Sequence, residues 1–434
     1  MSITKQFGKY VSQNILGMIG LSAYILADTY FISVAEGANG ITALNLVLPI
    51  YSMIFAIGSM IAVGSATRFK IARAKGEKKA EYYLSNAIMW AFLFSIIFMV
   101  GGLFVPERIV SLMGGKGEII SVATPYTRIF MSFAPCFMLN HIFSAFVRND
   151  DAPSIAMIAT FSSSIFNVVM DYVLMFPCKM GMPGAALATA CSPIVGITIC
   201  LIHVFSKKST LHFYWRIPSL NMLIESMSLG IAAFVGEIAS GVTTMVFNFL
   251  ILNISGNVGI AAYGIVANVA IVAVSIFNGI AQGGQPLFSK SYGANKKEDM
   301  KKLLKLSMTT AIIFAILIMV VVNLLSNPLI LAFNHEQNVE MAKYAKQGIA
   351  IYFAGFLFAG VNIVGTGYLS STAQAKGAFT VSILRGVVAI VICAVLLSWL
   401  LGMTGVWLAF PVAEAITTLI LIALLLKAHK KKSS

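Results

Sequence analysis

Charged residues are scarce in this sequence. Only 11% of its 434 residues are charged and 59% are hydrophobic, with a mean hydropathy of +0.89, whereas soluble domains carry about 25% charged residues. A soluble globular fold is therefore excluded. Acidic residues are the scarcer kind, 16 against 30 Lys and Arg. The net charge of +14 would indicate nucleic acid in a soluble protein, but the basic residues cluster between long apolar runs, so we expect no nucleic-acid partner.

Several patterns that carry chemistry elsewhere are also missing. The five cysteines show no C-x-x-C pairing and the five histidines no metal-ligand spacing, which argues against a disulfide framework or a metalloenzyme. A glycine-rich phosphate loop is absent, which argues against ATP-driven transport. The polar start of the chain runs directly into an apolar stretch without a cleavage pattern, so we expect no signal peptide. No cofactor is predicted.

Long apolar runs dominate what is present. A membrane-spanning helix needs about 20 apolar residues, and this criterion predicts an all-α polytopic membrane protein with twelve transmembrane helices. The predicted spans are 10–34, 41–66, 84–106, 121–146, 154–176, 183–205, 221–252, 258–284, 303–325, 341–370, 379–401 and 404–427.

The basic residues indicate the orientation of these spans. Of the 30 Lys and Arg residues, 24 fall in segments on the N-terminal side of the predicted membrane and 6 on the other side. By the positive-inside rule both termini are expected to be cytoplasmic. We therefore predict a multi-pass membrane protein in contact with membrane lipids.

The chain also repeats itself. Residues 40–43 match 259–262, and 181–188 match 402–409, at offsets of 219 to 221. Chance recurrence of Gly and Ala is the alternative, but the matches occur in order. They predict a first six-helix bundle at 1–206, a cytoplasmic linker at 207–220, and a second bundle with a basic tail at 221–434. Because each half has six spans, an even number, both halves start on the same side of the membrane. A pseudo-two-fold axis along the membrane normal should therefore relate the bundles, with a central cavity between them.

Acidic residues inside spans are costly and indicate functional sites. Asp28, Asp171 and Thr189 each lie five or six residues from the outer end of their span, which is roughly 8 to 9 Å at 1.5 Å per residue. Asn167 lies one helical turn before Asp171. The sequence therefore permits an acidic and amide cluster in one layer of the first bundle. The alternative is that each carboxylate is satisfied locally for structural reasons.

Further buried polar residues are expected in the second bundle. Glu237 and Glu414 lie near the middle of spans seven and twelve. The residues predicted to line the substrate cavity are Glu237, Gln282, Asn362 and Glu414. The alternative is structural, with a neutral Glu bonded to Ser240 or Thr417.

Over residues 10–427 the chain resembles the multidrug and toxic compound extrusion (MATE) family, and within it the MepA-like multidrug exporters. The resemblance rests on the plan of two sets of six spans and on several short sequence segments. These segments are residues 27–32, 43–49, 282–286 with 292–294, Asn167-x-x-x-Asp171, and 184–189. The resemblance implies a monomeric secondary transporter of the bacterial cytoplasmic (inner) membrane, and not an enzyme. It implies export of amphipathic cationic drugs or toxic metabolites in exchange for inward H⁺ or Na⁺ by alternating access. It also implies a cation-coupling site formed by Asp28, Asn167, Asp171 and Thr189, with Na⁺ possible at the two aspartates.

Two departures from the family pattern matter. Glu237 matches a span-seven Glu of the Na⁺-coupled branch, but span ten offers only Asn362 where that branch carries an Asp. A Na⁺ site in the second bundle is therefore not expected. Span one contains Gly17 and Gly20 but no proline, so a large bend is not expected there.

Alternatives of other classes stay open. A flippase for lipid-linked oligosaccharides, from the same superfamily, would need buried cations, whereas we expect Arg128 and Arg385 only near helix ends. An intramembrane enzyme would need a clustered nucleophile and base, which the sequence does not show. A channel or receptor is a further possibility.

Overall fold

The computed structural model describes residues 2–333 and 338–430, so the end of the predicted basic tail lies outside the described residues. All regular elements in this part of the chain are helical. The first bundle contains α1 (Ile3–Ala74), η1 (Lys78–Tyr82), α2 (Tyr83–Phe104), α3 (Pro106–Leu112), α4 (Glu118–Ser132), α5 (Ala134–Asn149), α6 (Pro153–Met175) and α7 (Gly181–Val204). The second contains α8 (Leu220–Gly293), α9 (Lys297–Leu324), α10 (Ser326–Phe333), α11 (Val339–Tyr352), η2 (Phe353–Gly355), α12 (Phe356–Ser371), α13 (Ala375–Ile383), the π-helical η3 (Leu384–Val388), α14 (Ala389–Leu401) and α15 (Met403–Lys430).

These helices form twelve membrane-length spans within the described residues. When α1 is divided at its break and α8 is counted once, ten helices are long and apolar enough to cross a membrane. The count is eleven when α4 and α5, which are bent by 47° at Phe133, form one broken span. The 74-residue α8 supplies two spans, because Gly256 breaks it with a φ of 61°. Gly37 breaks α1 in the same way, with a φ of 58°, a conformation that costs glycine little. The prediction of an all-α polytopic membrane protein is confirmed.

The internal repeat is visible in the irregularities of the backbone. The breaking glycines Gly37 and Gly256 lie 219 residues apart, and the left-handed Gly181 and Gly402 lie 221 apart. Neither of the short helices α3 and α10 was predicted, and their first residues lie 220 apart. Because these features recur at the offset of the sequence repeat, both halves fold by the same local rules.

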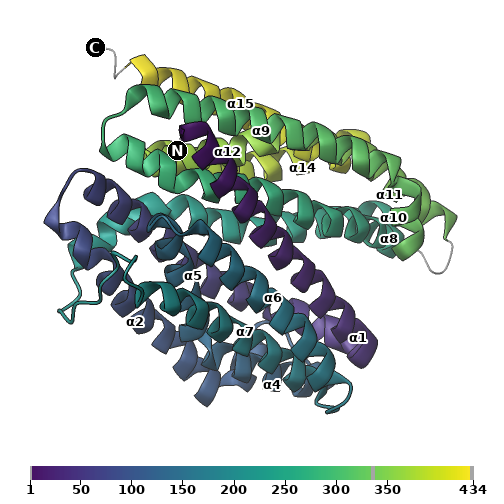
Figure 1. The fold of residues 1–434 in the computed structure, drawn as a ribbon. Coiled ribbons are helices and arrows are strands. Elements are labelled where there is room, and N and C mark those ends of the chain that lie inside the picture. Colours follow the sequence, from purple (N-terminus) through teal and green to yellow (C-terminus); the bar gives the residue numbers. More distant parts are fainter. Residues whose placement is uncertain (1, 334–337, 431–434) are drawn as a thin grey trace.

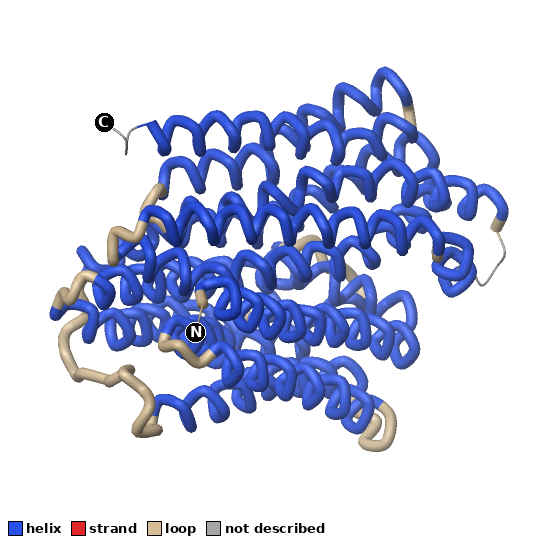
Figure 2. The backbone as a smooth tube through the Cα atoms, turned by 45° about the horizontal axis from the view of Figure 1, so that its top comes forward, coloured by secondary structure: helices blue, strands red, loops and turns tan. Residues whose placement is uncertain are grey.

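The two halves lie side by side as helical bundles (Figures 1 and 2), and each has its own hydrophobic core. One cluster of buried side chains spans residues 32–223. The other comes from residues 232–421 together with the first turns of α1, through Phe7, Tyr10, Val11 and Ile15. In Figure 1 the purple α1 accordingly starts against the green helices of the second half and crosses to the first half. The domain limits expected from the sequence stay a prediction.

The two halves approach each other most closely near one end of the molecule. This end carries both chain termini and the 205–219 linker (Figure 1). We call it the basic end, because the basic residues there include Arg73, Lys79, Lys208, Lys290 and Lys296. A Cβ on Gly64 of α1 would lie 1.9 Å from the carbonyl oxygen of Ser226 of α8. A Cβ on Gly283 of α8 would lie 2.8 Å from the Cα of Val11 of α1. Gly64 and Gly283 lie 219 residues apart, so the two backbone contacts occupy equivalent places in the repeat.

Candidate ion and substrate site

Two carboxyl groups meet inside the first half. Asp28 on α1 is 8% exposed and Asp171 on α6 is fully buried, and their side chains lie within hydrogen-bonding reach of each other. In the described part of the chain, the Oδ1 atom of each has no hydrogen-bond partner. An ionised carboxylate only accepts hydrogen bonds, so this contact requires a proton between the two groups or a cation beside them.

Asn167 and Thr189 complete the cluster. In the amide orientation that satisfies both neighbours, Asn167 Nδ2 donates to Asp171 Oδ2 at 3.1 Å. Its Oδ1 accepts from the Thr189 backbone N–H at 3.3 Å. The structure thus places the four predicted residues together, on α1, α6 and α7. The alternative, in which each carboxylate is satisfied locally, applies only in part. Asp171 bonds to Asn167 of its own helix, but the neighbour of Asp28 comes from another helix. The coupling role of the four residues stays a prediction.

Three tyrosines border this cluster, and sequence reasoning missed them. The hydroxyl groups of Tyr24 and Tyr51 lie 3.3 Å apart, and Tyr24 lies within electrostatic range of Asp28 and Asp171. The hydroxyl of Tyr126 is hydrogen-bonded to the side chain of Thr189. A signal existed for Tyr24, which precedes Asp28 by one helical turn. Tyr51 and Tyr126 come from other spans, and nothing in the sequence indicates which way they face.

An aromatic group continues from Tyr51 away from the carboxyl pair. Tyr51 stacks on Phe55 with ring centroids 4.2 Å apart and on Phe130 at 4.8 Å, and Phe130 contacts Phe137 at 4.5 Å. Tyr51 and Phe55 are half-buried, while Phe130 and Phe137 are buried. Aromatic faces attract cations as well as apolar groups. An acidic pair beside aromatic rings therefore suits a flat amphipathic cation.

Glu237 reaches across the boundary between the halves. It is half-buried on α8, and its carboxyl group is hydrogen-bonded to Ser59 of α1. Ser240, its expected structural partner, instead donates to the backbone carbonyl of Glu237 at 3.1 Å. Tyr24 lies within electrostatic range of Glu237 as well as of the aspartate pair. Glu237 thus lies on the same side of the first half as the pair, and its cavity role stays a prediction.

Glu414 and Asn362 lie in a closed network inside the second half. Arg385 donates to Glu414 Oε1 from Nη2 at 2.7 Å and from Nε at 3.1 Å, and Asn362 Nδ2 donates to Oε2 at 2.6 Å. Glu414 is 1% exposed and Asn362 fully buried. Thr417 bonds to the Ala413 carbonyl rather than to this carboxylate. In this conformation neither predicted cavity residue faces an open space, and their cavity role stays a prediction.

The position expected for Arg385 was wrong. It lies on the π-helical turn η3, ten residues inside the helical span Ala375–Leu401, and not near a helix end. A single π turn is common at functional or strained places in helices. The sequence does not reveal such a turn, so the ion pair with Glu414, 29 residues away, was missed.

Gln282 lies at the basic end, where three helices meet. Arg148 of α5 donates from Nη1 to Gln282 Oε1 of α8 and to Asn14 Oδ1 of α1, the latter at 2.8 Å. Arg148 is only 8% exposed, although it lies two residues beyond the predicted span 121–146. Gln282 therefore helps to join the halves, and its predicted contact with substrate stays a prediction.

No group of three or more His, Cys, Asp or Glu side chains comes together in the described residues. A sodium ion would have to be held by the two aspartates together with amide, hydroxyl or carbonyl oxygens. Thr189 Oγ1, which lies 3.3 Å from the side-chain amide of Asn167, is one such oxygen, whereas Asn167 turns its Nδ2 toward Asp171.

Comparison with known proteins decides the family. The family model MatE matches residues 14–173 and again 232–395. The chain belongs to the MATE family. Because one model matches twice, the comparison agrees with the repeat seen in the backbone. The multidrug export protein MepA of Staphylococcus saprophyticus is 29% identical over 400 residues, covering 91% of this chain and 87% of that protein. MepA of Staphylococcus aureus is 28% identical with the same coverage.

Solved structures support the fold of this MATE protein. An outward-facing MATE transporter of the MOP superfamily superposes with a TM-score of 0.94 at 17% identity, covering 100% of this chain and 98% of the other. A Vibrio cholerae MATE transporter gives 0.91 at 17% identity, covering 99% and 98%. At 17% sequence identity, this structural similarity establishes only the fold. Together with the family match, the comparisons identify a membrane transporter of a multidrug efflux family and not an enzyme.

Proposed function

We propose that this transporter exports amphipathic cations in exchange for inward protons, by alternating access. The contact between Asp28 and Asp171 carries this proposal. Two adjacent buried carboxyl groups do not both ionise readily, so the pair exchanges between a state that holds a proton and one that attracts another cation. Proton uptake from one side then displaces the drug, and proton release on the other side restores the charge.

Geometry favours a proton over Na⁺ as the coupling ion. A hydrogen bond between two carboxyl groups needs only a proton, whereas a metal cation bound by oxygens needs several ligands around it. In the structure the carboxyl groups of Asp28 and Asp171 contact each other directly. This arrangement supports a site that closes around a proton.

The energetics decide which gradient matters for a monovalent drug. One charge crossing 100 mV gains about 2.3 kcal/mol, while a hundredfold drug gradient requires about 2.7 kcal/mol. A monovalent cation leaving as one proton enters moves no net charge, so the voltage contributes nothing. The pH gradient must then supply the free energy.

We therefore expect a pH gradient alone to drive export of a monovalent cationic dye from proteoliposomes. The membrane potential is held at zero with valinomycin and equal K⁺ on both sides, and dye fluorescence reports transport. A Na⁺ gradient at equal pH, and a potential at equal pH, should each give the rate of protein-free vesicles. Export driven by Na⁺ at clamped pH would overturn proton coupling, and export driven by voltage alone would overturn the one-to-one exchange.

We further propose that Glu237 contacts the cationic group of the substrate, while Glu414 serves the internal ion pair. Glu237→Gln should weaken binding of a cationic dye by about tenfold, the effect of losing about 1.4 kcal/mol of charge interaction, and leave an uncharged analogue unaffected. Glu225→Gln removes a partly exposed carboxylate near the start of the same helix and serves as the matched control. Binding is measured by fluorescence anisotropy in detergent. Equal loss for both dyes in Glu237→Gln would assign this residue to structure.

The orientation is proposed from the charge pattern, with the basic end in the cytoplasm of a bacterium. In a variant whose five natural cysteines are replaced, Asn257→Cys should react with an impermeant maleimide added to intact cells. Lys78→Cys, at the basic end, should react only after the membrane is permeabilised. Both positions are exposed, so accessibility depends on the side of the membrane. External labelling of Lys78→Cys would reverse the orientation.

A further inference from the structure

The linker between α7 and α8, residues 205–219, is firmly attached where it begins. Asp150 accepts hydrogen bonds from the Thr210 backbone N–H at 3.0 Å, from Ser209 Oγ at 3.1 Å and from His203 Nε2 at 2.9 Å. Burial alone would raise the pKa of Asp150, but bonds from the Thr210 side chain and backbone, His203 and Arg73 outweigh it and lower the pKa. The carboxylate therefore stays charged at neutral pH and fixes this end of the linker.

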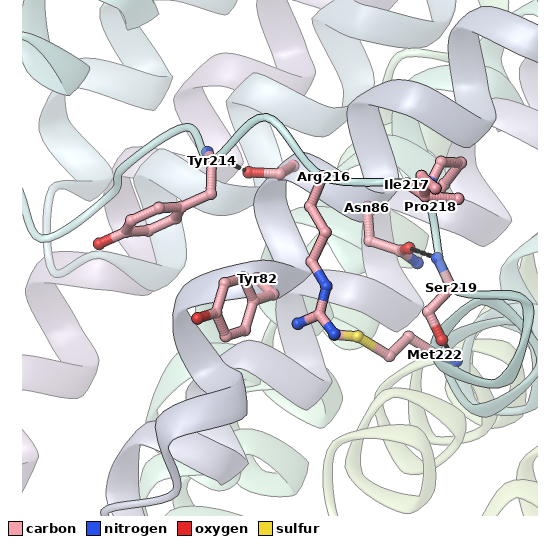
Figure 3. Close-up of a pocket in the computed structure, with 9 residues that line it drawn as sticks. Tyr82, Asn86, Tyr214, Arg216, Ile217, Pro218, Ser219 and Met222 are labelled. Atoms are coloured by element: carbon pink, nitrogen blue, oxygen red, sulfur yellow. Dashed lines mark hydrogen bonds between the residues drawn. The ribbon is translucent and has the colours of Figure 1, made fainter.

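The linker is attached again where it ends, against α2 (Figure 3). The Tyr214 backbone N–H donates to Ser85 Oγ at 2.8 Å, and the Ser219 N–H donates to Asn86 Oδ1 at 2.6 Å. Trp90 Nε1 donates to the Ser219 carbonyl at 3.3 Å. With both ends bonded to side chains of the first half, the backbone of 210–219 has a defined path over the end of the bundle.

Side chains between these attachments alternate. Tyr214 and Arg216 turn toward Tyr82, with the guanidinium 5.2 Å from the Tyr82 ring centre and the two tyrosine rings 5.4 Å apart. The intervening side chains Phe213, Trp215 and Ile217 are 47%, 87% and 89% exposed. An extended chain sends successive side chains to opposite sides. One edge of the segment thus binds the protein, and the other presents the large apolar side chains of Phe213 and Trp215. Ile217 is exposed as well but also borders the pocket between the segment and α2.

A small pocket lies beneath the inner edge. It measures about 100 Å³ and is lined by Tyr82, Ser85, Asn86, Arg216 and Met222 among others. Sites for drug-sized molecules usually measure about 300–1,000 Å³. The pocket is therefore too small for a transported drug, but its guanidinium and amide groups suit a single anionic group.

Unpaired positive charge lies along this segment, beside the carboxylate of Glu81, which is bonded to the Tyr214 side chain. Lys78, Lys207, Lys208 and Arg216 take part in none of the ion pairs found in the described residues, and all four are exposed. The linker lies at the level where α7 ends and α2 and α8 begin (Figure 2). Basic residues next to the ends of spans attract anionic lipid headgroups, and Trp is enriched at this level of a membrane.

We propose that residues 213–217 form an interfacial anchor for an anionic phospholipid. Phe213, Trp215 and Ile217 enter the membrane interface of the leaflet at the basic end, and Arg216 with the pocket beneath it holds the lipid phosphate. The occupant is a phospholipid because the exposed apolar edge and the unpaired cations lie together beside the ends of spanning helices. The anchor fixes the linker that joins the two halves of the transporter to one leaflet.

The test places a small polarity-sensitive fluorophore on Trp215→Cys in the cysteine-replaced protein, reconstituted in vesicles. Lipids brominated on their acyl chains quench fluorophores that enter the membrane. Trp399→Cys is the positive control, since Trp399 is 82% exposed on the spanning helix α14. Glu298→Cys, at an 86% exposed side chain in the first turn of α9, is the negative control. Quenching of the 215 label comparable to that of 399 supports the anchor, and quenching no greater than that of 298 overturns it.

The same label tests the phosphate. The vesicles contain phosphatidylcholine alone or phosphatidylcholine with phosphatidylglycerol, and Arg216→Gln is compared with Lys302→Gln from the other basic loop. Phosphatidylglycerol should increase quenching at 215 in the parent and in Lys302→Gln, but not in Arg216→Gln. An equal increase in all three, or none in any, overturns the assignment of the phosphate to Arg216. Thermal unfolding of each variant shows that the fold is retained, and none of these readouts depends on transport.

Discussion

Asp28→Asn and Asp171→Asn should each reduce proton-driven export to the rate of protein-free vesicles. Each substitution keeps the size of the side chain and its ability to form hydrogen bonds, but an amide cannot take up or release a proton. Both aspartates are buried and in contact, so water cannot replace the lost function. Export is measured with the pH-gradient assay described above, and the loss should be at least about a hundredfold, or about 2.7 kcal/mol.

A second readout separates coupling from folding. Exchange of labelled for unlabelled dye across the membrane, with no ion gradient, requires substrate binding and alternation but no proton cycle. It should persist in Asp28→Asn and Asp171→Asn, because the proposed contact of Glu237 with the dye and one of the two aspartates remain. The thermal unfolding temperature should stay near that of the parent. Ser164→Ala is the matched control, because Ser164 is buried on the helix of Asp171 and donates to the Thr160 carbonyl rather than to either acid. If either Asn variant exports dye at the parent rate under a pH gradient, the pair is not the coupling site.

This cluster could be anticipated because depth in a membrane span depends simply on residue number. Counting from the outer ends of three predicted spans placed Asp28, Asp171 and Thr189 in one layer, and the helical repeat placed Asn167 beside Asp171. Rotation about the helix axis is different, since it depends on packing against neighbours. For that reason Tyr51 and Tyr126, which complete the surroundings of the site, could not be assigned.

Other features depended on local departures from regular helix. Arg385 meets Glu414 from a π-helical turn, and no residue pattern in 384–388 indicates that turn. Arg148 was taken for a loop charge because it follows an apolar span. In the structure it is buried and bonded to Asn14 and Gln282, since three helices converge where the sequence shows only the end of one. A single sequence does not show which residues of distant helices will contact each other.

Gly64→Val and Gly283→Val should each prevent the two halves from closing at the basic end. At Gly64 the new Cβ would lie 1.9 Å from a backbone carbonyl oxygen, and at Gly283 2.8 Å from a backbone Cα. Neither backbone can move aside as a flexible side chain would. Overpacking costs about 1–3 kcal/mol even where side chains adjust, so the closed arrangement should become about tenfold to a hundredfold rarer at 1.4 kcal/mol per decade.

Export should fall by a similar factor, because an alternating transporter must close each end in turn. Thr67 reports the closure directly, since it is fully buried and accepts a hydrogen bond from Gln285 across the boundary at 2.7 Å. Thr67→Cys should react slowly with a maleimide in the parent and rapidly in both valine variants. Gly264→Val is the matched control, because a Cβ there meets no atom within 4 Å.

The repeat makes this prediction stricter than a single substitution would. Gly64 lies where the first half contacts α8, and Gly283 occupies the equivalent position in the second half, against α1. If closure at the basic end uses both contacts, the two variants should expose Thr67→Cys to the same extent, and the double variant should add little. Should Gly64→Val alone expose Thr67→Cys, closure would depend on one contact, and the two equivalent backbone contacts would not act together.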